Sequence, residues 1–232
     1  MNYGEIIELG YHRLMCGDAT SRDDVFKLVG SDTVDLVLTD PPYGVRSVDP
    51  KTGQIGSGSK IYAPVIGDTG TWMARDNWQI IRAIAPLIII WGGQNFTEFL
   101  PPSCGWIFWD KCKNSPDISF GDGELAWCNK GTKIKKYEHR WNGFCRDGSK
   151  ELNDKIHPNQ KPVELHARIL EDFSRDGATV LDCFGGSGTT LIAAEITGRK
   201  CLMMEISPEY CEIIKERYEK LKDVFTNYPA TA

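Results

Sequence analysis

The sequence has 232 residues, of which 41% are hydrophobic and 25% are charged, and its formal net charge is −5. These values are typical of a soluble chain with one substantial core, and they argue against a protein coated in positive charge. The longest apolar run, Ala83–Trp91, is interrupted by Pro86 and is too short to cross a bilayer, so we expect no membrane partner. Four of the eight cysteines lie in strand-like runs and no C-x-x-C pair occurs, which predicts reduced thiols, a cytoplasmic location and no metal site.

Short aliphatic or β-branched runs alternate with helix-like segments along the chain. This alternation predicts an α/β fold, with a largely parallel sheet that helices cover on both faces. The seven predicted strands are Arg13–Cys16, Val34–Thr39, Leu87–Trp91, Trp106–Trp109, Glu124–Cys128, Thr179–Cys183 and Cys201–Glu205. Four of these strands run directly into Gly or Asp, or into a Phe-Gly pair. Ligands of open α/β sheets gather at such carboxyl ends, so we expect the functional site there.

The segment Asp40-Pro41-Pro42-Tyr43 closes the second predicted strand. Two consecutive prolines fix φ and remove two donors, so we expect a rigid corner that presents a carboxylate, bare carbonyls and an aromatic face. This corner suits an amino group on a planar ring, because Asp40 and the Pro41 carbonyl can accept from the amine while Tyr43 stacks on the ring. Taken alone, the motif also fits a simple Pro-Pro turn that ends a strand.

Two segments depart from the strand–helix pattern, namely the loop 44–62 and a basic insertion at about 111–156. The first is rich in Gly and Ser, contains Arg46, and follows the Pro-Pro corner, so it is placed to close over a ligand bound there. Within the second, residues 130–150 carry seven Lys or Arg against two acids. The side chains expected to contact phosphates there are Lys133, Lys135, Lys136 and Arg140. Solvated surface loops remain the alternative for both segments.

Three helices are predicted in the last third of the chain. Val163–Phe173 has an apolar face at helical spacing, Thr189–Thr197 follows a glycine-rich turn, and the last helix begins after Ser207 as its N-cap, with Pro208 in the first turn. The turn contains Gly185, Gly186 and Gly188, which let the backbone approach a ligand where a Cβ would collide. The free N–H groups of the following helix point at the same place, so a polar ligand is expected.

Two acids restrict the identity of that ligand. The turn lacks Gly-Lys-Ser/Thr, which disfavours a phosphate-binding P-loop. Asp182 at the start of the turn suits an ammonium group, and Glu205 at the end of the next strand suits ribose hydroxyls. S-adenosylmethionine (SAM) has both an amino-acid end and a nucleoside end, so we expect it as the cofactor, with NAD as the alternative. Each acid also fits a simple role at the start of a helix.

Three segments resemble motifs of the beta group of SAM-dependent DNA amino-group methyltransferases, which modify N6 of adenine or N4 of cytosine. Asp40–Tyr43 resembles their catalytic motif, Phe184–Gly188 their cofactor loop, and His157–Pro162 the segment that precedes this loop. The order, with the catalytic motif first, is also that of the beta group. The resemblance implies a Rossmann-like, seven-stranded mixed sheet with helices on both faces, in circularly permuted motif order, within a single domain spanning residues 1–232.

The same resemblance implies double-stranded DNA as the partner and a set of site residues, and it makes the segments 44–62 and 111–156 candidate DNA-recognition segments. A base cannot be reached within a duplex, so we expect it to be flipped out. Asp18 is expected at the adenine of the cofactor, and Asn159 and Lys161 near its methionine carboxylate. The expected cofactor-binding residues are Asp18, Ala19, Asn159, Lys161, Asp182, Phe184, Gly185, Gly186, Ser187, Gly188, Thr189, Glu205 and Ile206. The expected catalytic residues are Asp40, Pro41, Pro42 and Tyr43.

The reaction predicted is methyl transfer to N6 of adenine, because enzymes that modify cytosine more often have Ser where Asp40 stands. N4-cytosine methylation is the nearest alternative, followed by methylation of a protein amide, a nucleic-acid-binding module without turnover, and an NAD-dependent oxidoreductase. Little room exists between Trp109 and His157 for a separate recognition region, so the recognised sequence should be short or read by a partner. A homodimer is compatible with the sequence, as are roles in restriction–modification, protection of a mobile element or regulation.

Overall fold

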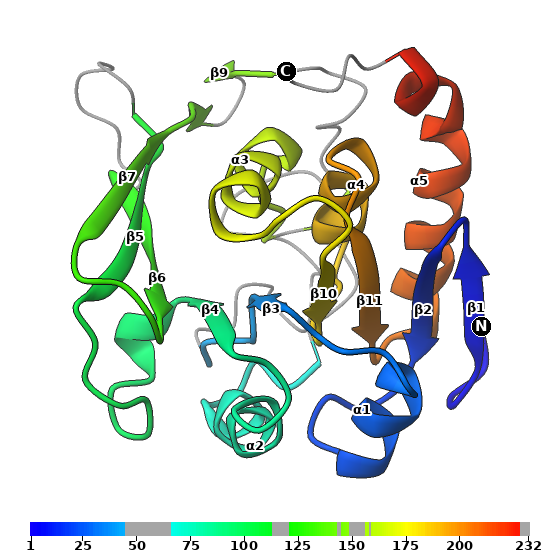
Figure 1. Ribbon diagram of the computed structural model, residues 1–232, viewed down its shortest axis with the longest axis horizontal. Helices are drawn as coiled ribbons and strands as arrows, with labels where there is room; N and C mark the ends of the chain where they lie inside the picture. Colours follow the sequence, from blue (N-terminus) through cyan, green and yellow to red (C-terminus); the bar gives the residue numbers. More distant parts are fainter. Residues whose placement is uncertain (45–65, 113–120, 143–144, 149–155, 158, 228–232) are drawn as a thin grey trace.

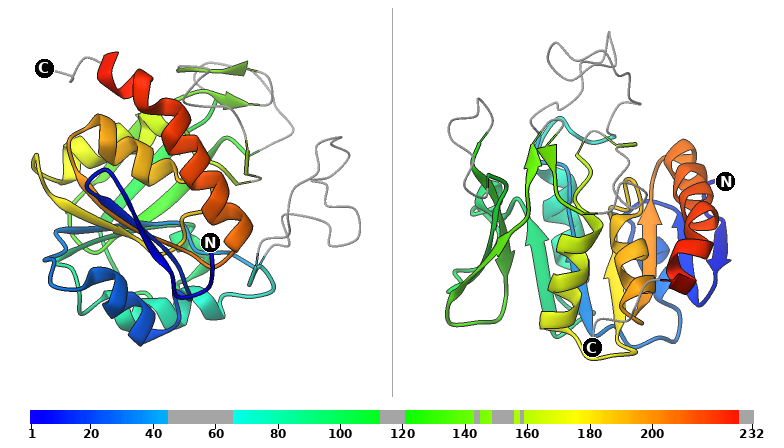
Figure 2. Two further views of the ribbon diagram at one scale, coloured as in Figure 1. Left: turned by 90° about the vertical axis from the view of Figure 1, so that its right-hand side faces the viewer. Right: turned by 90° about the horizontal axis from the view of Figure 1, so that it is seen from above.

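One large mixed sheet with helices on both faces forms the body of the protein (Figures 1 and 2). The computed structural model describes residues 1–44, 66–112, 121–142, 145–148, 156–157 and 159–227. The strands of the large sheet are β1 (Ile6–Leu9), β2 (His12–Cys16), β3 (Leu36–Thr39), β4 (Leu87–Trp91), β5 (Gly105–Asp110), β6 (Gly123–Cys128), β7 (Ile134–Glu138), β10 (Thr179–Asp182) and β11 (Lys200–Glu205). Two short strands, β8 (Trp141–Asn142) and β9 (Cys145–Arg146), pair separately. The helices are α1 (Arg22–Val29), α2 (Trp72–Ile81), the 3-10 turn η1 (Gly93–Asn95), α3 (Val163–Phe173), α4 (Thr189–Ile196) and α5 (Pro208–Asn227).

The order of the strands determines which segments meet at the edge of the sheet. The large sheet runs β1-β2-β11-β10-β3-β4-β6-β5-β7. The strands from β2 to β4 in this order are parallel, and β6 is antiparallel to both of its neighbours, β4 and β5. The carboxyl ends of β2, β11, β10, β3, β4 and β5 therefore lie at one edge, together with the amino end of β6. Strands that are distant in the sequence become neighbours, as where Val180 of β10 pairs with Leu36 of β3.

The sheet is buried because helices cover both of its faces. Helices α1 and α2 lie on one face, and α3, α4 and α5 lie on the other (Figure 1). All four residues of β3 and all four of β10 are buried, which explains why these strands are apolar throughout instead of alternating. One apolar cluster includes Leu170 of α3 and Ile214 of α5, and the other includes Leu28 of α1. Burial on both faces holds the strand ends in fixed positions.

The predicted α/β class and mixed sheet are confirmed, but the predicted strand number of seven is wrong. The structure adds β1 and β7, one at each end of the sheet. An edge strand is partly exposed to water, so it contains fewer apolar residues than a central strand. Strand β7 (IKKYE) contains two lysines, and its composition therefore predicts a surface segment. Part of the predicted basic insertion is thus an edge strand that pairs in register with β5, from Trp106 with Ile134 to Asp110 with Glu138.

The three predicted helices are present, and two further helices were not predicted. Helix α3 has the predicted bounds, α4 ends one residue earlier than predicted, and Ser207 caps α5 by accepting from the backbone N–H of Tyr210 at 3.3 Å. Helix α1 was missed although Ser21 is a clear N-cap, whose side chain accepts from the backbone N–H of Asp24. Helix α2 begins after Thr71, which makes no side-chain capping hydrogen bond.

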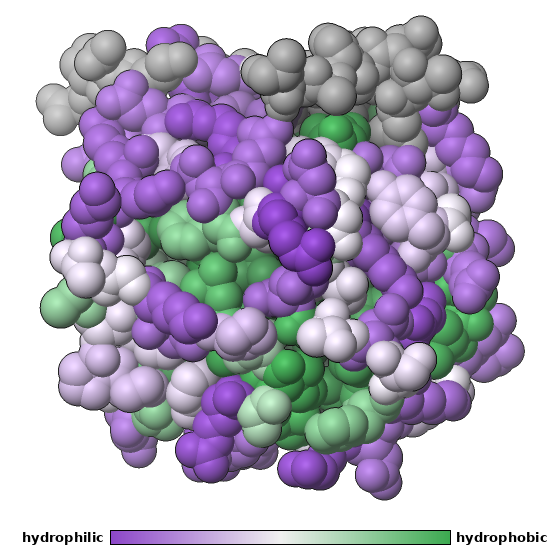
Figure 3. Space-filling view, viewed as in Figure 1, coloured by the Kyte–Doolittle hydropathy of each residue, from purple (hydrophilic) through white to green (hydrophobic). Residues whose placement is uncertain are grey.

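Most of the cysteines whose side chains are described lie in the interior of the protein. The seven cysteines whose side chains the structure describes are free, and Cys16, Cys128, Cys183 and Cys201 are buried. None of the described helices combines the length and the apolar character that crossing a bilayer requires. Hydrophilic residues cover much of the face in Figure 3, and hydrophobic residues gather in its lower centre, where Figure 1 shows β4 and α2.

Candidate active site

A cavity opens at the edge of the sheet where the parallel strands end. Together with the open solvent at its mouth, the cavity contains about 930 Å³ of space outside the protein atoms. Its wall is built from the residues that follow four neighbouring strands: Gly17 and Ala19 after β2, Asp40–Tyr43 after β3, Asp182–Ser187 after β10, and Glu205–Ser207 after β11. The segment leading into α3 closes one side with Asn159 and Lys161. Segments separated by some 140 residues thus share one cavity.

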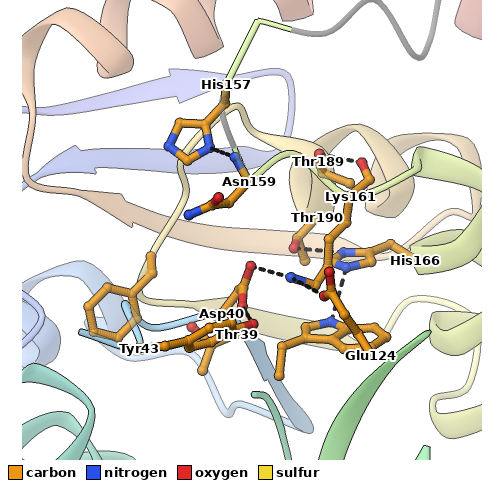
Figure 4. A network of polar contacts seen from close by, with 12 residues as sticks. Thr39, Asp40, Tyr43, Glu124, His157, Asn159, Lys161, His166, Thr189 and Thr190 are labelled. Atoms are coloured by element: carbon orange, nitrogen blue, oxygen red, sulfur yellow. Dashed lines mark hydrogen bonds and ion pairs between the residues drawn. The ribbon is translucent and has the colours of Figure 1, made fainter. Parts of the chain in front are cut away.

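Asp40 is held between two donors at the corner after β3 (Figure 4). The Tyr43 hydroxyl donates to Oδ1 of Asp40, and Nζ of Lys161 donates to Oδ2. Burial raises the pKa of Asp40, while the positive charge of Lys161 opposes that rise. The pKa of Tyr43 is also raised well above its ordinary value by burial and by the nearby Asp40 charge, so the phenol remains a donor. The carboxylate is therefore fixed in orientation from both sides.

The position of the Tyr43 ring depends on a glycine after β4. Gly92 has a φ of 69°, and a Cβ built on it would lie 2.2 Å from Cε1 of Tyr43. On its other side the Tyr43 ring meets Phe96 edge-on, with 5.9 Å between the centroids. Gly92 therefore serves two needs, a left-handed backbone and room for the aromatic ring of the corner.

Lys161 links the corner to a second carboxylate. Its Nζ lies 3.2 Å from Oε2 of Glu124 and 5.1 Å from the centroid of Trp91, and its side chain is only 5% exposed. Lys111, which follows β5, donates to the other oxygen of Glu124. Although burial opposes ionisation, the charges of Lys161 and Lys111 lower the pKa of Glu124 to about 2. Four alternating charges thus run from Lys111 through Glu124 and Lys161 to Asp40.

Asp182 lies deeper in the cavity and is surrounded by neutral donors. It accepts from the Thr39 hydroxyl at 2.9 Å, the Thr190 hydroxyl at 2.6 Å and the backbone N–H of Phe184 at 3.1 Å. Burial outweighs these hydrogen bonds and raises the pKa of Asp182 to about 7. No cation balances its charge among these contacts, so Asp182 is suited to a cationic group on a ligand.

A buried histidine completes the packing beside Asp182. Nδ1 of His166 lies 3.1 Å from the Thr190 hydroxyl, and Nε2 accepts from the indole N–H of Trp91 at 3.2 Å. Because the Thr190 proton is directed to Asp182, the proton of His166 belongs on Nδ1. Burial lowers the pKa of His166 to about 3, so the ring is neutral and acts as a fixed bridge between α3, α4 and β4.

The glycine-rich turn is tied to the end of β11. The backbone N–H of Gly186 donates to Oε2 of Glu205 at 2.8 Å, and that of Ser207 donates to Oε1 at 2.9 Å. Burial raises the pKa of Glu205 to about 6 despite these hydrogen bonds. A Cβ on Gly185 would lie 2.9 Å from Cγ of Met203, so only glycine lets the turn approach β11 this closely.

Most of the residues predicted from the sequence meet in the cavity. Those that line it are Ala19, Asp40, Pro41, Pro42, Tyr43, Asn159, Lys161, Asp182, Phe184, Gly185, Gly186, Ser187, Thr189, Glu205 and Ile206. Gly188 lies behind the wall against Ile214, and Asp18 is occupied in a local turn, where it accepts from the backbone N–H and the hydroxyl of Thr20 at 2.8 Å each. Gly17 and Ala19, on either side of Asp18, are the lining residues there.

Two polar side chains of the site are not predicted from the sequence. The sequence predicts Glu124 only as the first residue of a strand, and His166 only as part of a helix. The available signal for Glu124 was strand direction, because the amino end of an antiparallel strand lies at the same edge as the carboxyl ends of its parallel neighbours. That signal requires the strand order, which sequence alone did not provide. His166 gives no signal beyond being polar on the buried face of a predicted helix.

The predicted phosphate-contacting residues lie outside the cavity, and two of them pair with acids of the same molecule. Lys135 lies 3.1 Å from Asp172, and Lys136 lies 2.9 Å from both Asp110 and Glu138. Lys133 is exposed, while Arg140 is partly buried. Arg46 and most of the loop 44–62 fall outside the described residues. The ion pairs favour a surface role for the β7 lysines over dedicated DNA contacts.

Comparison with known proteins finds similarity to DNA methylases and type II methyltransferases. A family model described as DNA methylase matches residues 103–216. The chain is 27% identical to the type II methyltransferase M2.MboI of Moraxella bovis over 84% of each sequence, and 25% identical to M2.LlaDCHI of Lactococcus lactis subsp. cremoris over 85% of this chain and 87% of the relative.

Two solved structures share the fold at low sequence identity. The PvuII DNA methyltransferase, described as cytosine-N4-specific, superimposes with a TM-score of 0.58 at 16% identity and covers 98% of this chain and 96% of its own. The complex of M1.HpyAVI with SAM gives a TM-score of 0.57 at 20% identity, covering 88% and 97%. These two structures are similar to this chain in fold. The sequence matches support an N6/N4 amino-group DNA methyltransferase.

Proposed function

We propose that this protein transfers a methyl group from SAM to the N6 amino group of an adenine flipped out of double-stranded DNA. The observation that carries the proposal is that the Asp40–Tyr43 corner and the Gly185–Gly188 turn face a single cavity. An amine acceptor and a cofactor cradle must lie this close together, because direct transfer requires the nitrogen to reach the methyl carbon in line. A Pro-Pro turn with only a structural role would have no reason to share the cavity.

The cavity residues fit SAM at both of its ends. Asp182 has a buried carboxylate without a cationic partner among its described contacts, which suits the ammonium group of the methionine end. Glu205 keeps free lone pairs beyond its two backbone donors, which suits ribose hydroxyls. The absence of a Cβ at Gly185 lets the turn pack against β11 and keeps the cradle open. SAM supplies an electrophilic methyl group on a sulfonium centre.

The corner supplies what the amine needs. The exocyclic nitrogen of adenine is a weak nucleophile because its lone pair is delocalised into the ring. Asp40 and the Pro41 carbonyl accept from its two N–H groups, which favours a tetrahedral nitrogen and stabilises the positive charge that develops on it. Bound SAM would supply the methyl group to this nitrogen and keep the bonding pair on its sulfur, and the methylated nitrogen would then lose a proton to solvent water. Tyr43 presents its ring to hold the flipped base.

The choice of adenine over cytosine is proposed from Asp40, since cytosine enzymes of this group more often have Ser at this position. N4-cytosine methylation remains the second candidate, because the PvuII enzyme with the same fold is described as cytosine-N4-specific. Phosphate contacts by Arg46, Lys133 and the rest of the segments 44–62 and 111–156, and a homodimer, stay predictions.

Digestion of methylated DNA to nucleosides tests the proposal. Unmethylated DNA is incubated with the protein and SAM, and the nucleosides are identified by mass spectrometry. We expect N6-methyladenine from the wild-type protein and none from Asp40→Ala, whose affinity for SAM should stay within about threefold of wild type. N4-methylcytosine alone would overturn the choice of adenine. Label transferred to protein and not to DNA would overturn the substrate class.

A further inference from the structure

The backbone after Asp40 cannot stabilise the charge of its carboxylate. Pro41 and Pro42 have no backbone N–H, so the two positions after Asp40 cannot donate to it as ordinary residues at a strand end would. Asp182, by contrast, receives the backbone N–H of Phe184, two positions later, as well as two hydroxyls. An ionised, desolvated carboxylate needs charged or hydrogen-bonding partners, or it takes up a proton. The corner itself supplies one neutral donor, the Tyr43 hydroxyl, so a positive charge for Asp40 must come from elsewhere in the fold.

Lys161 is the cation placed to do so. It comes from the segment before α3, lies across the cavity, and donates to Oδ2 of Asp40 with a side chain that is 5% exposed. The resemblance to the family places Lys161 near the methionine carboxylate of the cofactor, but here its ammonium group lies between two carboxylates of the protein. Its backbone carbonyl also accepts from the Thr189 hydroxyl at 3.2 Å, which ties Lys161 to the start of α4.

Glu124 limits the effect of this cation on the reaction. A lone ammonium beside Asp40 would oppose the positive charge that develops on the amine. Glu124 lies 3.2 Å from Nζ of Lys161, so the three charges of Asp40, Lys161 and Glu124 sum to −1. Lys111 holds the outer oxygen of Glu124 from the rim of the site. The three charges nearest the amine, those of Asp40, Lys161 and Glu124, thus keep a net charge of −1 while each of them is paired.

We propose that Lys161 is a positioning residue that keeps Asp40 ionised and oriented toward the substrate amine, and that Glu124 holds Lys161 in place and moderates its charge. The inference rests on the proposed function, because it assigns Asp40 the amine as its partner. The titratable and charged groups that face Asp40 are Tyr43 on its own segment, Lys161 before α3, Glu124 on β6 and Asp182 on β10. Of these, Lys161 alone is a cation.

Opposite pH shifts in two variants test the proposal. Lys161→Met removes the cation, so Asp40 should protonate at higher pH, and the acid limb of the single-turnover rate should move up by at least about one pH unit. Glu124→Gln removes the opposing anion, so the acid limb should move down. Lys161→Arg retains the charge and should keep the wild-type midpoint even where the rate falls. A rate loss that is equal at every pH in Lys161→Met would overturn the proposal.

A readout that needs no activity separates this proposal from the proposed function. The carboxyl of Asp40 is titrated by ¹³C NMR in the full-length protein, with its signal assigned from Asp40→Asn. We expect the midpoint to rise in Lys161→Met and to fall in Glu124→Gln, whichever base is methylated. An unchanged midpoint in Glu124→Gln would refute the coupling even where Lys161→Met does not fold. A tenfold loss of SAM affinity in Lys161→Met with an unchanged midpoint would instead assign Lys161 to the cofactor.

Discussion

Asp182→Asn should stabilise the folded protein at neutral pH while weakening cofactor binding. Desolvation raises the pKa of Asp182 from 3.8 to about 7, against the hydrogen bonds from Thr190, Phe184 and Thr39 that lower it. A shift of about three units corresponds to roughly 4 kcal/mol of unfolding free energy that the ionised carboxylate costs above pH 7. Asparagine keeps one acceptor for the hydroxyls and carries no charge, so the variant avoids most of that cost.

The pH dependence of the gain follows from the direction of the shift. A carboxyl whose pKa is raised by folding destabilises the folded state progressively as the pH rises from its unfolded pKa to its folded pKa. For Asp182 this window lies between about 4 and 7. Urea unfolding at pH 5 and pH 8 measures the effect, and the advantage of Asp182→Asn over wild type should grow by roughly 2.5 kcal/mol between them.

Two outcomes would refute this reasoning. An advantage of Asp182→Asn that is the same at both pH values would show that the carboxylate is not strained by burial. Unchanged SAM affinity in calorimetry would show that its charge does not serve the cofactor. Asp32→Asn is the matched control, because the ion pairs of Asp32 with Arg13 and Lys200 lower its pKa against desolvation. That variant should lose stability at pH 8, and its deficit should shrink as the pH falls.

Three further predictions concern the ring, the ribose site and the basic strand. Gly92→Ala should lower the free energy of unfolding by about 1 kcal/mol because of the left-handed φ, and the new Cβ should displace the Tyr43 ring. We expect kcat/KM for DNA to fall at least about tenfold while SAM affinity is unchanged. Gly177→Ala is the control, because its φ of 71° is similar but open space surrounds it, so that variant should lose stability without losing activity. Glu205→Gln should weaken SAM binding in calorimetry by roughly tenfold, since a hydrogen bond to a charged group is lost, and equal affinity would remove Glu205 from the cofactor site. Lys136→Met should change the free energy of unfolding by less than about 1 kcal/mol, because its ion pairs are exposed. The variant should also leave unchanged the slope of log DNA affinity against log salt concentration. A slope reduced by about one would show that Lys136 contacts a phosphate.

The sequence is sufficient for the parts of the site that are local. The Asp40 corner and the glycine-rich turn each occupy a few consecutive residues, whose backbone restrictions can be derived from prolines and glycines alone. The acids at the strand ends, Asp182 and Glu205, follow from the strand pattern. These segments line the cavity as predicted, and α3 has its predicted bounds.

Features that depend on strand order could not be predicted in the same way. Glu124 reaches Lys161 because β6 runs antiparallel beside β4, and His166 reaches Thr190 because α3 packs on α4. Neither contact can be predicted from the residues next to it in the sequence. Strand β7 was hidden for a different reason, since an edge strand exposes one side to water and tolerates Lys135 among its residues. Composition therefore predicted a solvated segment where hydrogen bonding to β5 forms a strand.

The free site stores electrostatic strain that a cationic ligand would relieve. Three carboxyls of the cavity, Asp40, Asp182 and Glu205, all have pKa values raised by burial, and each is stabilised by a different means. Asp40 has a lysine and a phenol, Asp182 has hydroxyls, and Glu205 has backbone N–H groups. SAM carries a sulfonium and an ammonium, whereas the demethylated product loses the sulfonium charge. Because the cavity keeps its excess of negative charge throughout, it should bind the sulfonium-bearing cofactor more tightly than the demethylated product, which favours release of the product after transfer.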